Sequence, residues 1–172
     1  MRLETSQGRR HIAVMSRAFT KETETPAVLP ERIAEPHPNY VTPQGLEKLR
    51  ARIPTLQQEL LDAGSRGDNA AQQAIANELR WLEARCATAI AIDPARQPQG
   101  RVAFGAKVEV EDDNGDVSRW RIVGEDEADA GAGSVSWRSP LARALEGACI
   151  GDTVTWVRPA GPRELTVRAI AY

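Results

Sequence analysis

Two stretches of the chain place apolar residues at alternating gaps of three and four, the first over residues 46–63 and the second over residues 75–89. A repeat of this kind keeps one apolar stripe on one side of a helix, as in a coiled coil. A glycine-containing break at 64–67 separates the two stretches. Two helices joined in this way bury their stripes by packing antiparallel, so residues 41–93 are predicted to form a helical hairpin.

Individual residues mark the ends and the interior of these two helices. Thr42 is a suitable N-cap for the first helix, with Pro43 at its first position, and Asp68 is a suitable N-cap for the second. Pro54 removes one backbone hydrogen bond, so we expect it to kink or shorten the first helix. Cys86 falls on the apolar stripe and is expected to be a small core residue, not a reactive thiol.

From residue 101 onward, apolar and polar residues alternate, which is the period of a β-strand. An Asn-Gly pair at 114–115 is typical of the turn between two antiparallel strands. Trp120 and Trp156 lie on predicted strands, and we expect both in the core of the sheet.

A short helix interrupts this strand pattern. Ser139 and Pro140 supply a cap and a first turn for a helix over 141–146. Residues 101–172 are therefore predicted to form a small antiparallel sheet with one short helix, and the chain as a whole to be an α+β protein.

The remaining segments precede or connect these units. Residues 1–40 hold four prolines among charged residues and show no sustained period, so we expect a flexible N-terminal arm. Met15 offers a second translation start within this arm. The proline- and glycine-containing stretch 94–100 is expected to be a hinge.

Composition excludes several classes of function. The 172 residues include 22 basic and 24 acidic side chains, so bulk charge does not attract the chain to nucleic acid. Two cysteines without a CxxC spacing and two histidines do not make a zinc site. No apolar run reaches the length of about 20 residues that a membrane span needs, so a cytoplasmic location is expected.

Candidate catalytic groups are few. Both histidines, His11 and His37, lie in the predicted arm, so no rigid scaffold holds a general base for a nucleophile. The acidic run at 125–129 is a candidate for binding a hard cation, but it lacks the spacing of an EF-hand loop. We expect this run to be solvated surface and predict no metal site.

Four segments resemble the bacterial Gre transcript-cleavage factors and together cover about residues 39–172. Two resemble the C-terminal domain of that family, and two resemble the entry to and exit from its coiled coil: IDPARQPQGRVAFGAKVEVEDDNGDVSRWRIVGEDE (92–127), SPLARALEGACIGDTVTW (139–156), NYVTPQGLEKL (39–49) and LRWLEARCATAIAID (79–93). The resemblance implies an FKBP-like C-terminal domain that binds RNA polymerase at its secondary channel, with the coiled coil pointing inward.

The resemblance also implies docking residues, which we carry over by motif: Asp126, Ser139, Pro140, Leu141, Ala142 and Arg143. At helical spacing, at least two of Leu141, Ala144 and Leu145 are expected in the core. An exposed arginine can make a bidentate contact with a partner carboxylate, so Arg143 is the best interface candidate among them.

The hairpin tip departs from the family pattern. In the family, two acidic side chains in a GDxxENA-type turn help to hold a magnesium ion in the polymerase active site, which then cuts backtracked RNA. Here the turn reads GSRGDNAAQQ (64–73), and Ala71 stands where the second acid is required. Each helix is also shorter by about ten residues, which leaves the tip about 15 Å short. Asp68 is thus only a weak catalytic candidate.

These observations predict an RNA polymerase-binding regulator of transcription elongation with weak or no stimulation of cleavage. It resembles a short-armed relative within the family, the regulator of nucleoside diphosphate kinase. We expect no enzymatic activity, no cofactor of its own (any magnesium would be that of the polymerase), no sequence-specific nucleic-acid binding and a monomer. Two alternatives stay open: an active cleavage factor that uses Asp68, and an FKBP-like peptidyl-prolyl isomerase.

Overall fold

The computed structural model describes residues 37–172, so Met15, His11 and nearly all of the predicted arm lie outside the described residues. In chain order the elements are β1 (Asn39–Val41), α1 (Pro43–Ser65), α2 (Asn69–Thr88), β2 (Ala89–Ala91), η1 (Pro94–Arg96), β3 (Lys107–Asp112), β4 (Val117–Val123), η2 (Glu125–Glu127), η3 (Ala130–Ala132), β5 (Ser134–Ser136), α3 (Pro140–Leu145), β6 (Thr153–Trp156) and β7 (Arg163–Ala171). Within residues 37–172, no helix combines the length and the apolar character needed to cross a membrane.

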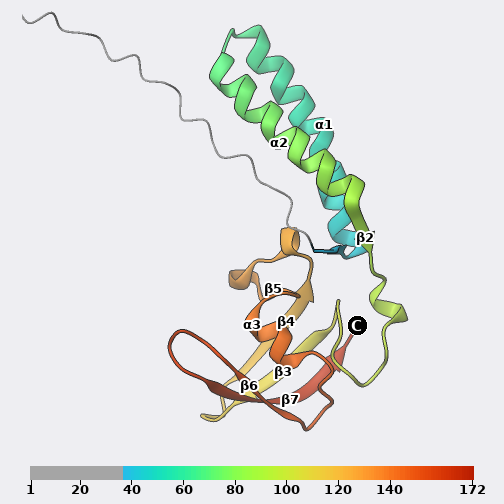
Figure 1. Cartoon of the computed structure of the whole chain (residues 1–172), viewed down its shortest axis with the longest axis vertical. Helices are drawn as coiled ribbons and strands as arrows, with labels where there is room; N and C mark the ends of the chain where they lie inside the picture. Colours follow the sequence, from blue (N-terminus) through green and yellow to red (C-terminus); the bar gives the residue numbers. More distant parts are fainter. Residues whose placement is uncertain (1–36) are drawn as a thin grey trace, which may run out of the picture.

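The predicted helical hairpin is confirmed. Helices α1 and α2 lie side by side and project away from the sheet domain (Figure 1). Every position of the two apolar repeats is buried or half-buried, and Leu56, Ala63 and Leu82 are at most 3% exposed. The Thr42 side chain accepts a hydrogen bond from the Gly45 N–H at 3.0 Å, as an N-cap does.

Pro54 does not shorten α1, which was one of the two effects expected of it. The helix is continuous through Pro54 to Ser65. The lost hydrogen bond is offset by the apolar stripe on both sides of the proline, because Leu56 and Ala63 beyond it are fully buried in the hairpin. Helix packing therefore outweighs the local backbone preference at this position.

The sheet domain has five strands in the order β5-β4-β3-β7-β6 (Figure 1). The β3–β4 turn contains Gly115 at φ 84°, as the Asn-Gly pair predicted. The pairs β3–β4, β3–β7 and β6–β7 are antiparallel, but β5 pairs with β4 in parallel. The connection through η2 and η3 carries the chain back along β4, so that Ser134 pairs with Arg121 and β5 then runs in the same direction as β4, unlike in the antiparallel prediction.

The core of the sheet domain lies between the sheet and α3. Its buried residues include Val108, Val110, Leu145 and Val167, each at most 1% exposed. Trp120 and Trp156 were expected inside, but both are half-buried and pack against the edge of this core. The α+β class is confirmed, whereas the FKBP likeness and the domain boundaries stay predictions.

A short parallel sheet joins the two ends of the hairpin, and no sequence pattern indicated it. Strand β1 precedes α1, strand β2 follows α2, and Asn39 is in register with Ala89. Strand β1 begins at Asn39, within the range expected to be an arm. The pairing fixes the base of the hairpin directly beside the sheet domain (Figure 1).

Candidate functional site

The hairpin tip presents one carboxylate, and that carboxylate caps a helix. Asp68 Oδ1 accepts a hydrogen bond from the Ala71 N–H at 3.0 Å, which confirms the predicted N-cap of α2. The Asp68 N–H donates to Ala63 O at 3.0 Å, and Gly67 supplies the left-handed turn at φ 67°. The turn is exposed, but its acidic group is engaged by the helix backbone.

No second acid joins Asp68 at the tip. It is the sole acidic residue among residues 64–73. The preceding acid, Asp62 on α1, accepts a hydrogen bond from Gln58 Nε2 at 2.9 Å. Over residues 37–172, no group of three or more His, Cys, Asp or Glu side chains is placed to hold a metal ion.

The predicted docking segment forms the start of α3. Ser139 Oγ accepts a hydrogen bond from the Ala142 N–H at 3.1 Å, as expected of an N-cap. Leu141 and Ala142 are 2% exposed and belong to the core, so their side chains offer no surface to a partner in this structure. Pro140 and Arg143 are exposed and are the members of the segment that a partner can reach.

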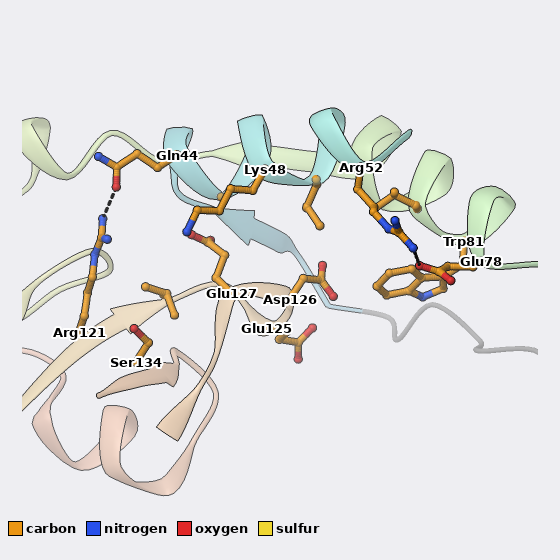
Figure 2. A pocket seen from close by; sticks show the side chains of 14 residues that line it. Gln44, Lys48, Arg52, Glu78, Trp81, Arg121, Glu125, Asp126, Glu127 and Ser134 are labelled. Carbon is orange, nitrogen blue, oxygen red and sulfur yellow. Dashed lines mark hydrogen bonds and ion pairs between the residues drawn. The ribbon is translucent and has the colours of Figure 1, made fainter. Parts of the chain in front are cut away.

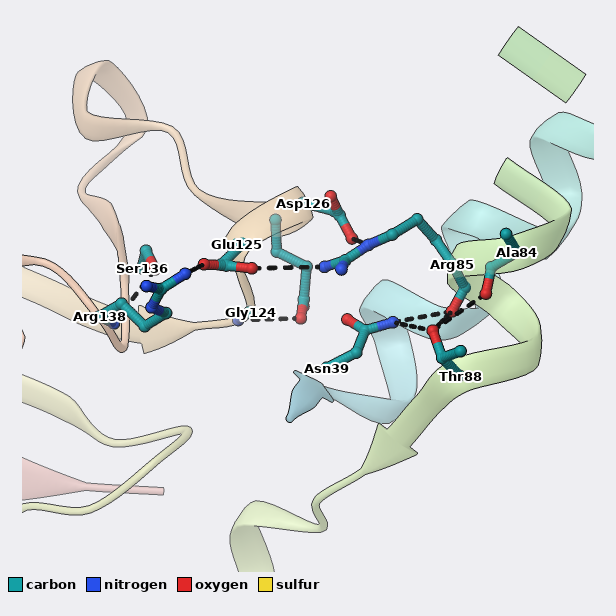
Figure 3. A network of polar contacts seen from close by, with 10 residues as sticks. Asn39, Ala84, Arg85, Thr88, Gly124, Glu125, Asp126, Ser136 and Arg138 are labelled. Atoms are coloured by element: carbon teal, nitrogen blue, oxygen red, sulfur yellow. Dashed lines mark hydrogen bonds and ion pairs between the residues drawn. The ribbon is translucent and has the colours of Figure 1, made fainter. Parts of the chain in front are cut away.

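The remaining predicted docking residue, Asp126, is bound inside the protein (Figure 3). Arg85 Nε on α2 donates to Asp126 Oδ2 at 2.6 Å, and the two side chains are 10% and 11% exposed. The Arg85 guanidinium also lies 3.6 Å from Glu125, which pairs with Arg138 at 2.6 Å. Asp126 thus joins α2 to the sheet domain.

Glu127 holds the other helix of the hairpin. Its carboxylate accepts hydrogen bonds from the Thr42 N–H at 2.8 Å, from the Thr42 hydroxyl and from the Gly124 N–H at 3.2 Å. A Cβ added at Gly45 would lie 2.0 Å from Glu127 Cδ. Glycine is therefore required at residue 45 for the carboxylate to reach the start of α1.

Asn39 completes this junction from β1. Its Nδ2 donates to Arg85 O at 2.8 Å and to Thr88 Oγ1 at 3.2 Å, and the residue is 5% exposed (Figure 3). The same segment of α2 is therefore bound by β1 through its backbone and by η2 through the Arg85 side chain.

The expectation that the acidic run at 125–129 is solvated surface is wrong for its first three residues. Their carboxylates bind α1, α2 and Arg138, as described above. One feature of the sequence could have identified Arg85 as a partner of the acidic run. Arg85 lies three residues after Leu82 and four before Ala89, on the apolar side of α2. A charge at such a position needs a buried partner.

Cys86 behaves as a packed residue. It is half-buried beside the junction, and burial raises the pKa of its thiol. A raised pKa lowers the fraction of reactive thiolate at neutral pH. The prediction of a core cysteine without nucleophilic chemistry fits this environment.

Two cavities lie near the junction. The larger, of about 600 Å³, lies between the hairpin and the sheet domain, and Figure 2 shows Lys48 and Arg121 toward one end and Trp81 toward the other. The smaller, of about 100 Å³, is lined by Tyr40, Phe104 and Trp137, with the Tyr40 and Trp137 ring centroids 5.0 Å apart. Neither was apparent in the sequence.

Comparisons with known proteins give a family model and several named relatives. Residues 97–172 match the family model described as "Transcription elongation factor, GreA/GreB, C-term". The chain is 38% identical over 152 residues to transcription elongation factor GreA of Methylococcus capsulatus, covering 77% of this chain and 96% of that protein. It is 47% identical over 93 residues to GreA of Ralstonia nicotianae, covering 53% of this chain and 59% of the relative. The crystal structure of GreA factor homolog 1 of Thermus thermophilus aligns with a TM-score of 0.39 at 24% identity, covering 79% of this chain and all of that one.

Proposed function

This chain belongs to the GreA/GreB family of transcription elongation factors, and on that premise we propose that it binds RNA polymerase and regulates elongation with weak or no stimulation of transcript cleavage. The single observation that carries the second half of this proposal is the tip. A magnesium ion needs several oxygen ligands at about 2 Å, and this tip offers one carboxylate, already hydrogen-bonded to the Ala71 N–H.

The length of the hairpin supports the same proposal. The match to the Methylococcus protein runs over 152 positions but uses 77% of the 172 residues here, about 132, so about 20 positions of that relative have no counterpart. If the shortfall is shared between two helices, each loses about ten residues, or about 15 Å of reach at 1.5 Å per residue. A carboxylate displaced that far contributes nothing to a metal site.

The sheet domain is the proposed docking unit, with the secondary channel of the polymerase as its target. Of the six docking residues expected from the family motif, Arg143 is exposed on α3, and within the described part of the chain it makes no ion pair. Its guanidinium is free to bind a carboxylate of the partner in a bidentate manner. Asp126, which is bound to Arg85, supports docking by fixing the direction of the hairpin.

No cofactor of the chain's own is needed for this function. Any magnesium ion involved would be the one that the polymerase carries. The protein acts by occupying a site, so the proposal assigns it no catalytic residue.

The first test measures transcript cleavage on stalled elongation complexes. We expect the wild-type chain to bind core RNA polymerase and to leave the RNA length unchanged on the timescale over which an active cleavage factor shortens it. Strong shortening of the RNA that is lost in Asp68→Asn would overturn the proposal and establish the alternative of an active cleavage factor.

The second test addresses docking. Arg143→Glu should weaken polymerase binding at least tenfold and leave the melting temperature nearly unchanged, because the side chain is exposed. Arg96→Glu, at an exposed arginine of η1, makes the same change in net charge and should bind like the wild type. Equal affinity of both variants would remove α3 from the docking surface.

The smaller cavity, lined by Tyr40, Phe104 and Trp137, gives little support to the alternative of a peptidyl-prolyl isomerase. The cavity has aromatic walls, as a proline site needs, but its volume of about 100 Å³ is well below the roughly 300–1,000 Å³ of small-molecule sites. Fold likeness is a weak warrant for activity. A proline-isomerisation assay on the full chain is expected to show no acceleration.

A further inference from the structure

We propose that the smaller cavity, lined by Tyr40, Phe104 and Trp137, binds the quaternary ammonium head of a small organic cation. In such a head the charged nitrogen carries only carbon substituents and has no N–H group. The site is separate from the hairpin tip and from the larger cavity, and the inference does not depend on polymerase binding.

The smaller cavity gathers aromatic side chains from a chain that has few of them. The 172 residues include two Phe, four Trp and two Tyr, and one of each kind lines this cavity. The Tyr40 ring centroid lies 6.0 Å from that of Phe104 and 5.0 Å from that of Trp137, at interplanar angles of 64° and 57°. The rings therefore meet at steep angles, as walls do, and do not stack flat. Aromatic rings placed around a cation attract it through the negative charge of their faces.

The charge at this cavity is negative. Among the described residues that line it, Glu146 is the one with a charged side chain. Glu146 follows the last residue of α3, is exposed, and its carboxylate has no partner in the part of the chain that the structure describes. The cation next to Trp137 in the sequence, Arg138, is paired with Glu125 at 2.6 Å. A cation that enters the cavity thus meets a carboxylate whose charge no ion pair compensates.

The walls favour a quaternary ammonium over a primary one. Ala103, Ile122 and Ala142 complete the lining with apolar side chains, so Glu146 and the Tyr40 hydroxyl are the side-chain acceptors that the described lining offers. A primary ammonium has three N–H donors, and a donor that leaves water without finding an acceptor costs free energy. A quaternary ammonium has no such donor, so contact with the aromatic rings and the nearby carboxylate is sufficient to offset the loss of water.

The size of the cavity limits the ligand to one such head group. An apolar cavity of about 150 Å³ holds a benzene molecule, and this one has about 100 Å³. Its walls are held by the backbone: the Trp137 N–H donates to Val123 O at 2.9 Å. The Gly105 N–H, next to Phe104, donates to Ile122 O at 2.8 Å. The site is therefore formed before a ligand binds, and the rest of the ligand stays outside it.

The test is an NMR titration of the full chain with choline, followed on the indole N–H signal of Trp137. The spectrum of Trp137→Phe identifies this signal, because it lacks it. We expect a saturable shift as choline is added. The matched control ligand is the neutral alcohol in which carbon replaces the nitrogen of choline. It has the same shape without the charge, so it should bind about tenfold more weakly.

Three variants test the walls of the site. Phe104→Leu keeps an apolar side chain but removes one aromatic ring, and it should weaken choline binding about tenfold. Glu146→Gln removes the charge and should weaken binding about threefold. Glu164→Gln, at an exposed glutamate of β7, makes the same change in net charge and should bind choline like the wild type. Melting curves establish that the variants are folded, and the exposed Glu146 keeps the test valid even if Phe104→Leu unfolds.

Absence of a saturable shift, or equal affinity for choline and its neutral analogue, would overturn the proposal. Equal affinity of the wild type, Phe104→Leu and Glu146→Gln would overturn it as well.

A further titration with tetramethylammonium defines the ligand more closely. The hydroxyl group of choline offers an acceptor to Trp137 Nε1, which is buried without a partner among residues 37–172. Equal affinity for the two cations identifies the ammonium head alone as the group that is bound. Tighter binding of choline identifies a ligand with an oxygen atom close to its ammonium group.

Discussion

Arg85 on α2 and Asp126 in η2 bind each other across 41 positions of the chain, with Nε and Oδ2 2.6 Å apart and both side chains about nine-tenths buried. This ion pair joins the hairpin to the sheet domain. A buried pair of this kind adds little net stability. Removing one of its residues is nevertheless costly, because the other charge then stays buried without an opposite charge beside it. The pair is therefore one of the contacts, together with those of Asn39 and Glu127, that hold the hairpin on the sheet domain.

Removing either partner of this pair should be strongly destabilising. Arg85→Met leaves a buried carboxylate unpaired, so we expect the free energy of unfolding to fall by about 3 kcal/mol. The double variant Arg85→Met/Asp126→Asn should recover a large part of this loss, because it leaves no buried charge. Urea denaturation of the single and double variants measures the coupling.

Arg119→Met supplies the comparison, since it breaks a surface pair with Glu109 and should lower stability by less than about 1 kcal/mol. If Arg85→Met were as mild as Arg119→Met, the pair would not hold the junction.

Gly45 and Glu127 form a second test of the junction. In Gly45→Ala the new Cβ displaces the Glu127 carboxylate, which then loses its hydrogen bonds to Thr42. We expect a loss of about 2 kcal/mol, the scale of a hydrogen bond to a charged group. Thermal unfolding measures it.

The double variant with Glu127→Ala isolates the cause of that loss. In the Glu127→Ala background there is no carboxylate to displace, so Gly45→Ala should be neutral or stabilising by about 0.5–1 kcal/mol from helix propensity. Destabilisation of equal size in both backgrounds would show that the clash is not with Glu127.

Local features of this fold could be predicted from the sequence because short-range spacing determines them. The apolar repeat placed the hairpin, and the caps at Thr42, Asp68 and Ser139 all accept the expected backbone hydrogen bonds. The Asn-Gly pair placed the β3–β4 turn. Each of these features depends on residues within about one helical turn or one strand of each other.

Long-range contacts explain what the sequence did not show. The parallel pairing of β5 with β4 depends on how the intervening η2 and η3 turn the chain, and the β1–β2 sheet joins residues 50 positions apart. The acidic residues of η2 looked like solvated surface because their partners, Arg85 and Thr42, are distant in the sequence. The periodicity of apolar residues does not predict which distant residues pair with each other.

The candidate site was predicted in part. The sequence of the turn at 64–73 showed directly that the tip has a single carboxylate. The SPLARAL motif at 139–145 placed Arg143 on an exposed helix face. The motif could not distinguish this exposed arginine from Leu141 and Ala142, which lie in the core. The cavity beside Lys48 was invisible because its walls come from separate elements.

Asp112 should make the stability of the sheet domain depend on acidic pH. Burial raises the pKa of its carboxyl, but hydrogen bonds from the Asp116 and Asn114 N–H groups and the Arg163 guanidinium at 2.6 Å outweigh burial and hold the pKa below its ordinary value. The carboxylate thus stabilises the fold above the unfolded-state pKa of about 3.9, and this contribution is lost as the pH falls through the lower folded-state pKa.

Denaturation midpoints between neutral pH and about pH 2.5 measure this effect. Asp112→Asn should be less stable than the wild type at neutral pH, and the difference should shrink in acid. Asp113→Asn changes the adjacent exposed carboxyl and should follow the wild-type curve. A constant difference between wild type and Asp112→Asn at all pH values would exclude the Asp112 charge as the cause.

Asp68 distinguishes a structural tip from a catalytic one. Because its carboxylate accepts the Ala71 N–H, Asp68→Ala should lower the free energy of unfolding by about 1 kcal/mol, the typical value of an N-cap. Asp68→Ser retains a capping oxygen and should be nearly as stable as the wild type. If Asp68 binds a metal ion, Asp68→Ser should stimulate RNA cleavage no more than Asp68→Ala does. If Asp68 only caps α2, Asp68→Ser should keep most of the stability that Asp68→Ala loses. Unfolding curves and RNA cleavage measured on the same three proteins separate the two roles, and unchanged stability of Asp68→Ala would contradict the capping role.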